Sequence, residues 1–282
     1  MNYRHSYHAG GFADVLKHSV LALIIQHLLK KDAAFRYIDT HAGLGRYDLR
    51  AADANKTGEW RDGIGRIWQA ELPSPVASLL APWRQAVEAL NGDGELRFYP
   101  GSPEIVRAHA RAQDRLTLCE LHPEDVARLK GHYARDARVS VVNLDGYTAA
   151  KAYVPPKERR GLVLIDPPFE EDGEWRRMAD TLQTAHGKWP GTYALWYPIK
   201  DVMESDAFAR TLGKLGIPSI ISAELFIQKP NDKARLNGCG LAIVNPPWTL
   251  EKDLTVLLPA LADHLGRGEG ARGRTVQIAG EA

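Results

Sequence analysis

The chain has 282 residues, of which 44% are hydrophobic and 25% charged, and its formal net charge is +1. Such values are typical of a soluble globular protein, and the near balance of charge excludes a uniformly basic nucleic-acid-binding surface. The two cysteines, Cys119 and Cys239, exclude a disulfide framework or a cysteine cluster for a metal, so we expect buried free thiols in a cytoplasmic protein.

The first predicted element is a helix over residues 13–31, where apolar residues recur at helical spacing. The N-terminal stretch MNYRHSYHAGGFADVLKH contains histidines and an acid where a signal peptide needs an apolar core, and the run VLALII is too short to span a bilayer. The next element, in FRYIDTHAGLGRY, is a short strand that ends at Asp39 and enters a loop with Gly43 and Gly45. These glycines allow a tight turn and the close approach of a ligand to the backbone.

Residues 50–96 interrupt the pattern, because they contain helical patches broken by glycine and proline and no convincing strand. We interpret them as a small helical insertion subdomain. The core is then formed by residues 1–49, which include the N-terminal tail and first helix, and by residues 97–282.

The rest of the chain alternates strands with helices. A strand that ends at Glu120, followed by a helix, is predicted in RLTLCELHPEDVARLKGHY. A second strand, which ends near Asp145, is predicted in RVSVVNLDGYTAA. A third, which ends at Asp166 and is followed by a helix, is predicted in RGLVLIDPPFEED. GTYALWYPIK is a further strand, SIISAELFIQK and GLAIVNPPW are the last two, and the Gly-rich basic tail is expected to be partly mobile. This order predicts an α/β, Rossmann-like sheet that is mostly parallel, with an antiparallel edge hairpin and a site at the C-terminal strand ends.

The strand ends have the layout of a class I S-adenosylmethionine-dependent methyltransferase. The first strand leads into the glycine loop. The second ends at Glu120, which can accept hydrogen bonds from both hydroxyls of a ribose. The third ends at Asp145, which can accept a hydrogen bond from an adenine amino group. The loop is not GxGxxG, so a pyrophosphate-binding dinucleotide fold is less favoured.

The fourth strand ends in Asp166, Pro167, Pro168 and Phe169, which fit methyl transfer to an exocyclic amine. The lone pair of an adenine amine is delocalised into the ring, and the Asp166 carboxylate and Pro167 carbonyl can accept both amine protons and direct that lone pair. Proline keeps the loop stiff. Phe169 offers a face to a base extruded from its stack, and such stacking is worth roughly 1–3 kcal/mol. The remaining requirement is in-line alignment of nitrogen, methyl carbon and sulfur.

A second copy of the motif, Asn-Pro-Pro-Trp at residues 245–248, ends the last predicted strand. Asp166 follows a strand beside the cofactor loop, whereas Asn245 is expected at the sheet edge, away from the topological switch point. We therefore predict that Asp166 is catalytic, that the second copy is a structural turn, and that Trp248 is a packing aromatic.

YRHSYHAGGFADVLKH near the N-terminus, YIDTHAGLGRYDL and LIDPPFE together resemble the bacterial 23S ribosomal RNA adenine-N6 methyltransferases of the RlmJ type. The resemblance runs over essentially the full chain. It implies a monomeric class I methyltransferase with a small helical insertion, Asp166 as the catalytic residue, and Tyr3 as an N-terminal residue that meets the RNA. The contacts to S-adenosylmethionine that it implies are His18, His41, Ser102, Glu120, Asp145 and Gly146.

Simpler readings of some of these residues remain open. Read alone, His18 is more often a partly buried structural histidine, Ser102 an N-cap, and Glu120 a surface ion-pair partner of Arg115 or His122. No His, Cys or carboxylate spacing supports a metal ligand set, so no metal is expected.

We expect Arg4 and His5 to contact RNA together with Tyr3. The lack of a large separate RNA-binding domain favours nascent or protein-free 23S RNA as the substrate, with no obligate protein partner and no membrane association. A DNA adenine-N6 methyltransferase is the runner-up, and a protein glutamine methyltransferase is less favoured because its motif is usually Asn-Pro-Pro-Tyr. A non-catalytic protein that has kept the cofactor fold is disfavoured by the intact motif.

Overall fold

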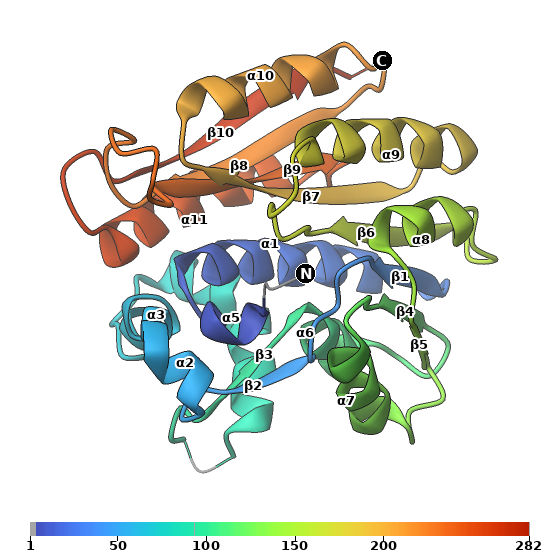
Figure 1. Cartoon of the computed structure of the whole chain (residues 1–282), viewed down its shortest axis with the longest axis horizontal. Helices are drawn as coiled ribbons and strands as arrows, with labels where there is room; N and C mark the ends of the chain where they lie inside the picture. Colours follow the sequence, from blue (N-terminus) through green and yellow to red (C-terminus); the bar gives the residue numbers. More distant parts are fainter. Residues whose placement is uncertain (1–3, 93, 282) are drawn as a thin grey trace.

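The structure is a computed structural model that describes residues 4–92 and 94–281. The strands of its main sheet are β1 (Phe35–Asp39), β4 (Arg115–Cys119), β5 (Val139–Val142), β6 (Arg160–Ile165), β7 (Thr192–Ile199), β8 (Ile220–Phe226), β9 (Gly238–Val244) and β10 (Arg272–Ala279). Their spatial order is β10-β8-β9-β7-β6-β1-β4-β5 (Figure 1). A separate pair is formed by β2 (Arg46–Asp48) and β3 (Phe98–Pro100).

Helices cover both faces of the main sheet. They are α1 (Phe12–Leu29), α2 (Ala52–Thr57), α3 (Glu59–Asp62), α4 (Ile64–Trp68), α5 (Ser74–Leu90), α6 (Ser102–His109), α7 (Pro123–Tyr133), α8 (Gly146–Ala152), α9 (Glu174–Lys188), α10 (Val202–Gly213) and α11 (Leu250–Leu265), after the short 3-10 helix η1 (His5–Tyr7). The larger buried cluster joins α1, α5, α6 and α11 to one face, and a smaller one joins α8, α9 and α10 to the other.

The directions of the strands position the site. Neighbours among β7, β6, β1, β4 and β5 are parallel, whereas β9 runs antiparallel to β7, β8 antiparallel to β9, and β10 antiparallel to β8. The predicted α/β sheet, mostly parallel with an antiparallel edge, is thus confirmed. Because parallel strands end at the same edge, the polar residues that follow β1, β4, β5 and β6 come close together.

The prediction for the end of the chain is wrong in two respects. GLAIVNPPW is not the last strand at the sheet edge, because β9 lies between β7 and β8. The tail, expected to be partly mobile, forms β10, which pairs with β8 from Arg272 to Ala279. The open edge of β8 offers backbone partners there, and the β-branched Thr275, Val276 and Ile278 suit a strand.

The predicted first helix is confirmed as α1, which is apolar around most of its circumference. By length and hydropathy it could cross a membrane, yet 72% of it is buried inside the protein, against α5, α6 and the sheet. A helix of this kind is the core helix of a globular domain. Its Asp14 and Lys17 are buried with it, so they need partners within the fold.

The range 50–96 contains α2 to α5 and, among its described residues, no strand. Its longest helix, α5, packs on α1, α6 and α11, and Trp83 from α5 lies in the larger core cluster. Whether these residues form a separate subdomain stays a prediction. Cys119 and Cys239 are buried free thiols, as expected, and burial raises the pKa of Cys119 to about 12.

Candidate active site

A cavity of about 910 Å³ opens at the C-terminal ends of the parallel strands. The loops after β1, β4 and β6, the start of α8, the first turns of α1, and η1 contribute to its wall. It is lined by the predicted site residues His5, His18, His41, Gly43, Ser102, Glu120, Asp145, Gly146, Asp166, Pro167 and Phe169. Arg4 is not among the lining residues, and Tyr3 lies outside the described residues.

Glu120 is fixed where β1 and β4 end side by side. The amide of Gly43 donates to Glu120 Oε2 and that of His122 to Oε1, each at 2.8 Å. Burial raises the pKa of Glu120, although these backbone bonds oppose the shift. Gly43 has φ 59, and a Cβ there would lie 2.2 Å from Tyr47 Oη, so the loop requires glycine. The carboxylate is therefore held rigidly at the cavity wall, not paired with Arg115 at the surface.

Asp145 caps α8, where its Oδ1 accepts from the amide of Thr148 at 2.9 Å. Its Oδ2 lies 3.5 Å from Arg177 Nη2, and the Arg177 guanidinium stands 4.4 Å from the centroid of the Tyr147 ring. Burial raises the pKa of Asp145, but the bonds from Thr148 and the charge of Arg177 outweigh it and leave the pKa below its usual value. Asp145 is consequently a charged acceptor at the cavity wall.

His41 packs edge-on against Tyr147, with ring centroids 5.6 Å apart, and its Nδ1 lies 2.7 Å from Thr40 Oγ1. Burial lowers the pKa of His41 to about 4, so the ring is neutral near pH 7. His18 is also buried, with its Nδ1 2.9 Å from Tyr99 Oη, and burial lowers the pKa of His18 well below its usual value. Both rings therefore present neutral polar surfaces.

Gly146 lies where the start of α8 meets the loop after β1. A Cβ there would stand 2.5 Å from the Thr40 carbonyl oxygen and 2.6 Å from His41 Cε1. Gly146→Ala is therefore expected to destabilise the protein by about 1–3 kcal/mol through overpacking. Thermal unfolding measures the loss. The matched control is Gly131→Ala in α7, where a Cβ would meet nothing within 4 Å. A Gly146 variant as stable as this control would contradict the packing argument.

Ser102 is held by a buried carboxylate and does not act as an N-cap. Gly101 is the N-cap of α6, and Ser102 Oγ donates to Asp39 Oδ2 at 2.7 Å. Tyr37 Oη donates to the same oxygen at 2.7 Å, and burial raises the pKa of Asp39 to about 6. Asp39 thus fixes Ser102 beside the glycine loop, and the N-cap alternative for Ser102 is wrong.

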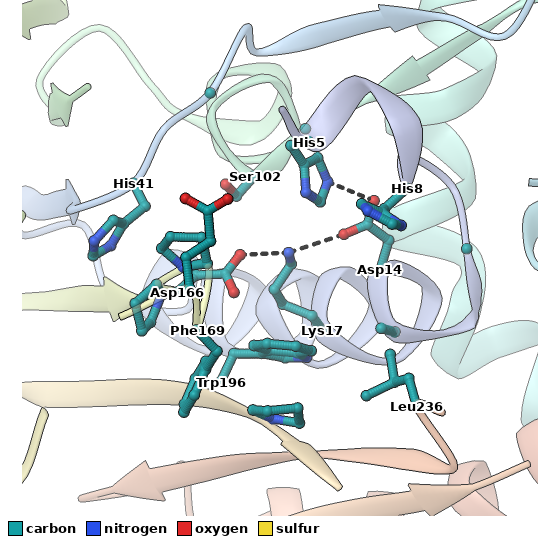
Figure 2. A pocket seen from close by; sticks show the side chains of 18 of the residues that line it. His5, His8, Asp14, Lys17, His41, Ser102, Asp166, Phe169, Trp196 and Leu236 are labelled. Atoms are coloured by element: carbon teal, nitrogen blue, oxygen red, sulfur yellow. Dashed lines mark hydrogen bonds and ion pairs between the residues drawn. The ribbon is translucent and has the colours of Figure 1, made fainter. Parts of the chain in front are cut away.

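A chain of polar side chains in contact runs from the N-terminal segment to Asp166 (Figure 2). His5 Nε2 lies 2.9 Å from Asp14 Oδ2, Lys17 Nζ 2.9 Å from Asp14 Oδ1, and Lys17 Nζ 2.5 Å from Asp166 Oδ2. Burial lowers the pKa of Lys17, but Asp14 and Asp166 outweigh it and hold that pKa well above its usual value. The ammonium is therefore a permanent donor to Asp166.

The Asp166 loop offers two oxygens without partners. Within residues 4–92 and 94–281, neither Asp166 Oδ1 nor the Pro167 carbonyl oxygen accepts a hydrogen bond. Phe169 follows with a left-handed φ of 53, and its ring packs edge-on against Trp175 and Trp196 at 4.8 and 6.0 Å between centroids. This contact fixes the aromatic ring beside the two acceptors.

The second motif copy lies at the N-terminal ends of the parallel strands, whereas the cavity lies at their C-terminal ends. Since β9 is antiparallel to β7, Asn245 emerges beside the beginning of β7, where its carbonyl accepts from Thr192 Oγ1 at 3.0 Å. Asn245 does not line the cavity, and Trp248 is 83% exposed. The prediction that Trp248 is a packing aromatic is therefore wrong, because the chain turns into α11 with that ring outside the core.

Known proteins resemble this chain over most of its length. A family model described as ribosomal RNA large subunit methyltransferase D, RlmJ, matches residues 32–277. The chain is 41% identical over 267 residues to ribosomal RNA large subunit methyltransferase J of Escherichia coli (strain K12), and 41% identical over 268 residues to the protein of that name from Haemophilus influenzae, covering 94% of both chains each time. The chain belongs to the RlmJ family. It is therefore a methyltransferase, as the resemblance implies.

A solved structure agrees with membership of the RlmJ family. The crystal structure of a protein from Legionella pneumophila str. Philadelphia 1 superposes with a TM-score of 0.86 at 32% identity, over 95% of this chain and 97% of that one. The fold built above from strand order is thus the fold of a close structural relative.

Sequence reasoning missed two charged residues that line this cavity, Asp14 and Lys17. Lys17 contacts the predicted catalytic Asp166 although 149 positions separate them. The available signal was the position of these two charged residues one turn apart in a mostly apolar helix, since buried charges need partners. Arg4 instead forms an ion pair with Glu124 of α7 at 2.5 Å, and its contact with RNA stays a prediction.

Proposed function

We propose that the chain binds S-adenosylmethionine and transfers its methyl group to the exocyclic N6 of an adenine in 23S ribosomal RNA. The observation that carries this proposal is a pair of acceptors on adjacent residues of the Asp166 loop, at the cavity wall, to which no described residue donates a hydrogen bond. An adenine amine has two protons to donate. The names of the curated relatives support a large-subunit ribosomal RNA substrate.

Lys17 determines which acceptor Asp166 presents. Its ammonium occupies Oδ2 at 2.5 Å, so Oδ1 is left for the amine, and the Pro167 carbonyl is the second acceptor. Two acceptors in fixed positions orient the nitrogen lone pair and stabilise the positive charge that develops on nitrogen. The target base would stack on Phe169, whose ring is supported by Trp175 and Trp196.

The other half of the cavity fits the cofactor. Gly43 and Gly146 line this half of the cavity, and Glu120 and Asp145 offer carboxylates at the ends of neighbouring strands. Glu120 would accept from ribose hydroxyls and Asp145 from the adenine amine, with His18, His41 and Ser102 completing the wall. S-adenosylmethionine supplies the electrophilic methyl group when bound. Among the described residues, no group of three or more His, Cys, Asp or Glu side chains could hold a metal ion.

Glu120→Gln is expected to weaken S-adenosylhomocysteine binding roughly 10- to 100-fold, because a hydrogen bond to a charged group contributes about 1.5–3 kcal/mol. Titration calorimetry gives the Kd. Glu88→Gln, an exposed glutamate of α5, is the matched control and should bind as wild type does. If both variants bind S-adenosylhomocysteine with the same Kd, Glu120 does not contribute to cofactor binding.

The proposal is tested by the transfer of labelled methyl from S-adenosylmethionine to unmodified 23S RNA, followed by nucleoside analysis. We expect N6-methyladenosine, and more of it on protein-free RNA than on assembled subunits. DNA and protein are offered to the enzyme in parallel assays. Methyladenine formed only in DNA would support the DNA methyltransferase alternative, and methylglutamine formed only in protein would support the protein methyltransferase alternative.

A further inference from the structure

The cavity has an arm that the proposed methyl transfer uses only where Trp196 supports the Phe169 ring. It follows β7, where Trp196, Pro198 and Lys200 line it. Side chains two positions apart on a strand face the same side, and the intervening Tyr197 points to the other face, where it bonds Ser222. The opposite wall carries Arg235 and Leu236 from the loop between β8 and β9. Figure 2 shows Trp196 and Leu236 bordering the space below the Lys17–Asp166 pair.

The arm changes from apolar to cationic toward its mouth. Trp196, Pro198 and Leu236 form the inner part, and Lys200 and Arg235 are exposed. Within residues 4–92 and 94–281 Lys200 forms no ion pair, and Arg235 pairs only with Asp232 at 3.2 Å. Arg235 is largely exposed and Asp232 about half exposed, so their attraction is weak and does not prevent Arg235 from binding another anion.

An aromatic wall followed by exposed cations has the chemistry of a nucleotide subsite. Bases stack on aromatic rings regardless of sequence, and phosphates bind lysine and arginine. A base that enters the Asp166 pocket stays joined to both neighbours through phosphodiesters, so the polynucleotide must run past the mouth of the same cavity. The continuity of the arm with the Asp166 pocket therefore identifies its occupant as an adjoining part of the substrate strand.

We propose that this arm binds the nucleotide next to the target adenosine, with its base against Trp196 and its phosphate at Lys200 and Arg235. The inference rests on the proposed function, whose RNA substrate it extends by one nucleotide. Trp196 and Lys200 are then specificity-determining residues that act through RNA binding.

Lys200→Ala tests the phosphate contact. On unmodified 23S RNA its KM should rise several-fold at low salt, and the slope of log affinity against log salt should fall by about 1, as for one lost phosphate contact. Its kcat at saturating RNA and its Kd for S-adenosylhomocysteine should stay at wild-type values, and Lys200→Arg should restore KM. Lys252→Ala, an exposed lysine of α11 that does not line the cavity, is the matched control.

The outcomes separate the two proposals. If wild type methylates the RNA and Lys200→Ala shows the KM and salt slope of Lys252→Ala, the subsite is overturned while the proposed function stands. If wild type transfers no methyl to RNA, the proposed function fails first and the subsite with it.

The base contact has a test of its own, on a fragment of 23S RNA that wild type methylates. Removal of the base on one side of the target adenosine should raise the wild-type KM about tenfold, within the range for loss of one stacking contact. The variant Trp196→Leu should have the same KM for the abasic RNA as for the intact fragment. A normal Kd for the cofactor shows that this variant is folded. Full activity of wild type on fragments abasic at either neighbour would overturn the stacking assignment.

Discussion

Asp166→Ala is expected to lower kcat for methyl transfer roughly 100- to 1000-fold, the usual cost of losing one fixed group that stabilises a transition state. The variant removes the free Oδ1 acceptor and leaves only the Pro167 carbonyl to orient the amine. Its affinity for S-adenosylhomocysteine should change little, because Glu120 and Asp145 lie on other strands. Single-turnover transfer to unmodified 23S RNA, together with cofactor titration, measures both quantities.

The second motif copy supplies the control for Asp166. Asn245→Ala changes the same motif position at the N-terminal ends of the parallel strands, away from the cavity, so wild-type transfer is expected. Equal transfer by Asp166→Ala and wild type would show that the fourth-strand motif is not catalytic. Loss of transfer in Asn245→Ala, with stability and cofactor affinity retained, would contradict the assignment made from strand direction.

Lys17→Met is expected to destabilise the protein by about 3–5 kcal/mol, because it leaves the carboxylates of Asp14 and Asp166 without their shared cation. For a chain of this size the loss corresponds to a fall in Tm on the order of 10 °C. Transfer should fall as well, since Asp166 Oδ2 then has no donor to hold it. Lys31→Met, an exposed lysine just past the end of α1, is the matched control.

The pH dependence of the stability difference identifies its cause. Burial raises the pKa of Asp14, but His5 and Lys17 outweigh it and hold that pKa well below its usual value. Ionised Asp14 thus stabilises wild type above its unfolded pKa, and that stabilisation is lost as the pH falls toward the folded pKa. Without Lys17 the Asp14 carboxylate protonates more readily, so the gap in unfolding free energy should narrow from pH 7 to about pH 4. A gap that stays constant over this range would indicate lost packing of the lysine stem instead.

The predictable part of the site is the part that follows strands. Glu120, Asp145 and Asp166 stand at or just beyond the ends of β4, β5 and β6, and parallel strands that end at one edge bring such residues together. Strand periodicity and glycine punctuation, which are local signals, were enough to find them. The side chains of all three residues line the cavity.

The parts that could not be predicted depend on distant partners. The place of Lys17 against Asp166 depends on how α1 crosses the end of β6, which no local pattern encodes. The pairing of β10 with β8 depends on the free edge of β8, which lies far away in the sequence. The tail was not predicted as a strand because its glycines and arginines outweighed the signal from its few β-branched residues. Ser102 looked like an N-cap because Pro103 follows it, but the buried Asp39 captures its hydroxyl.

The reversal of β9 has a consequence for recognising enzymes from short motifs. A search for acid or amide, two prolines and an aromatic residue finds two matches in this chain, and strand polarity rejects one of them. Asn245→Asp would make the second copy acidic like the first without creating a second reaction centre, because the side chain emerges far from the glycine loop. A match that follows a strand entered through a helical crossover is worth testing, whereas a match that follows the return strand of a hairpin is not. Connection type can be judged from sequence, so a motif scan that includes it would report fewer false sites.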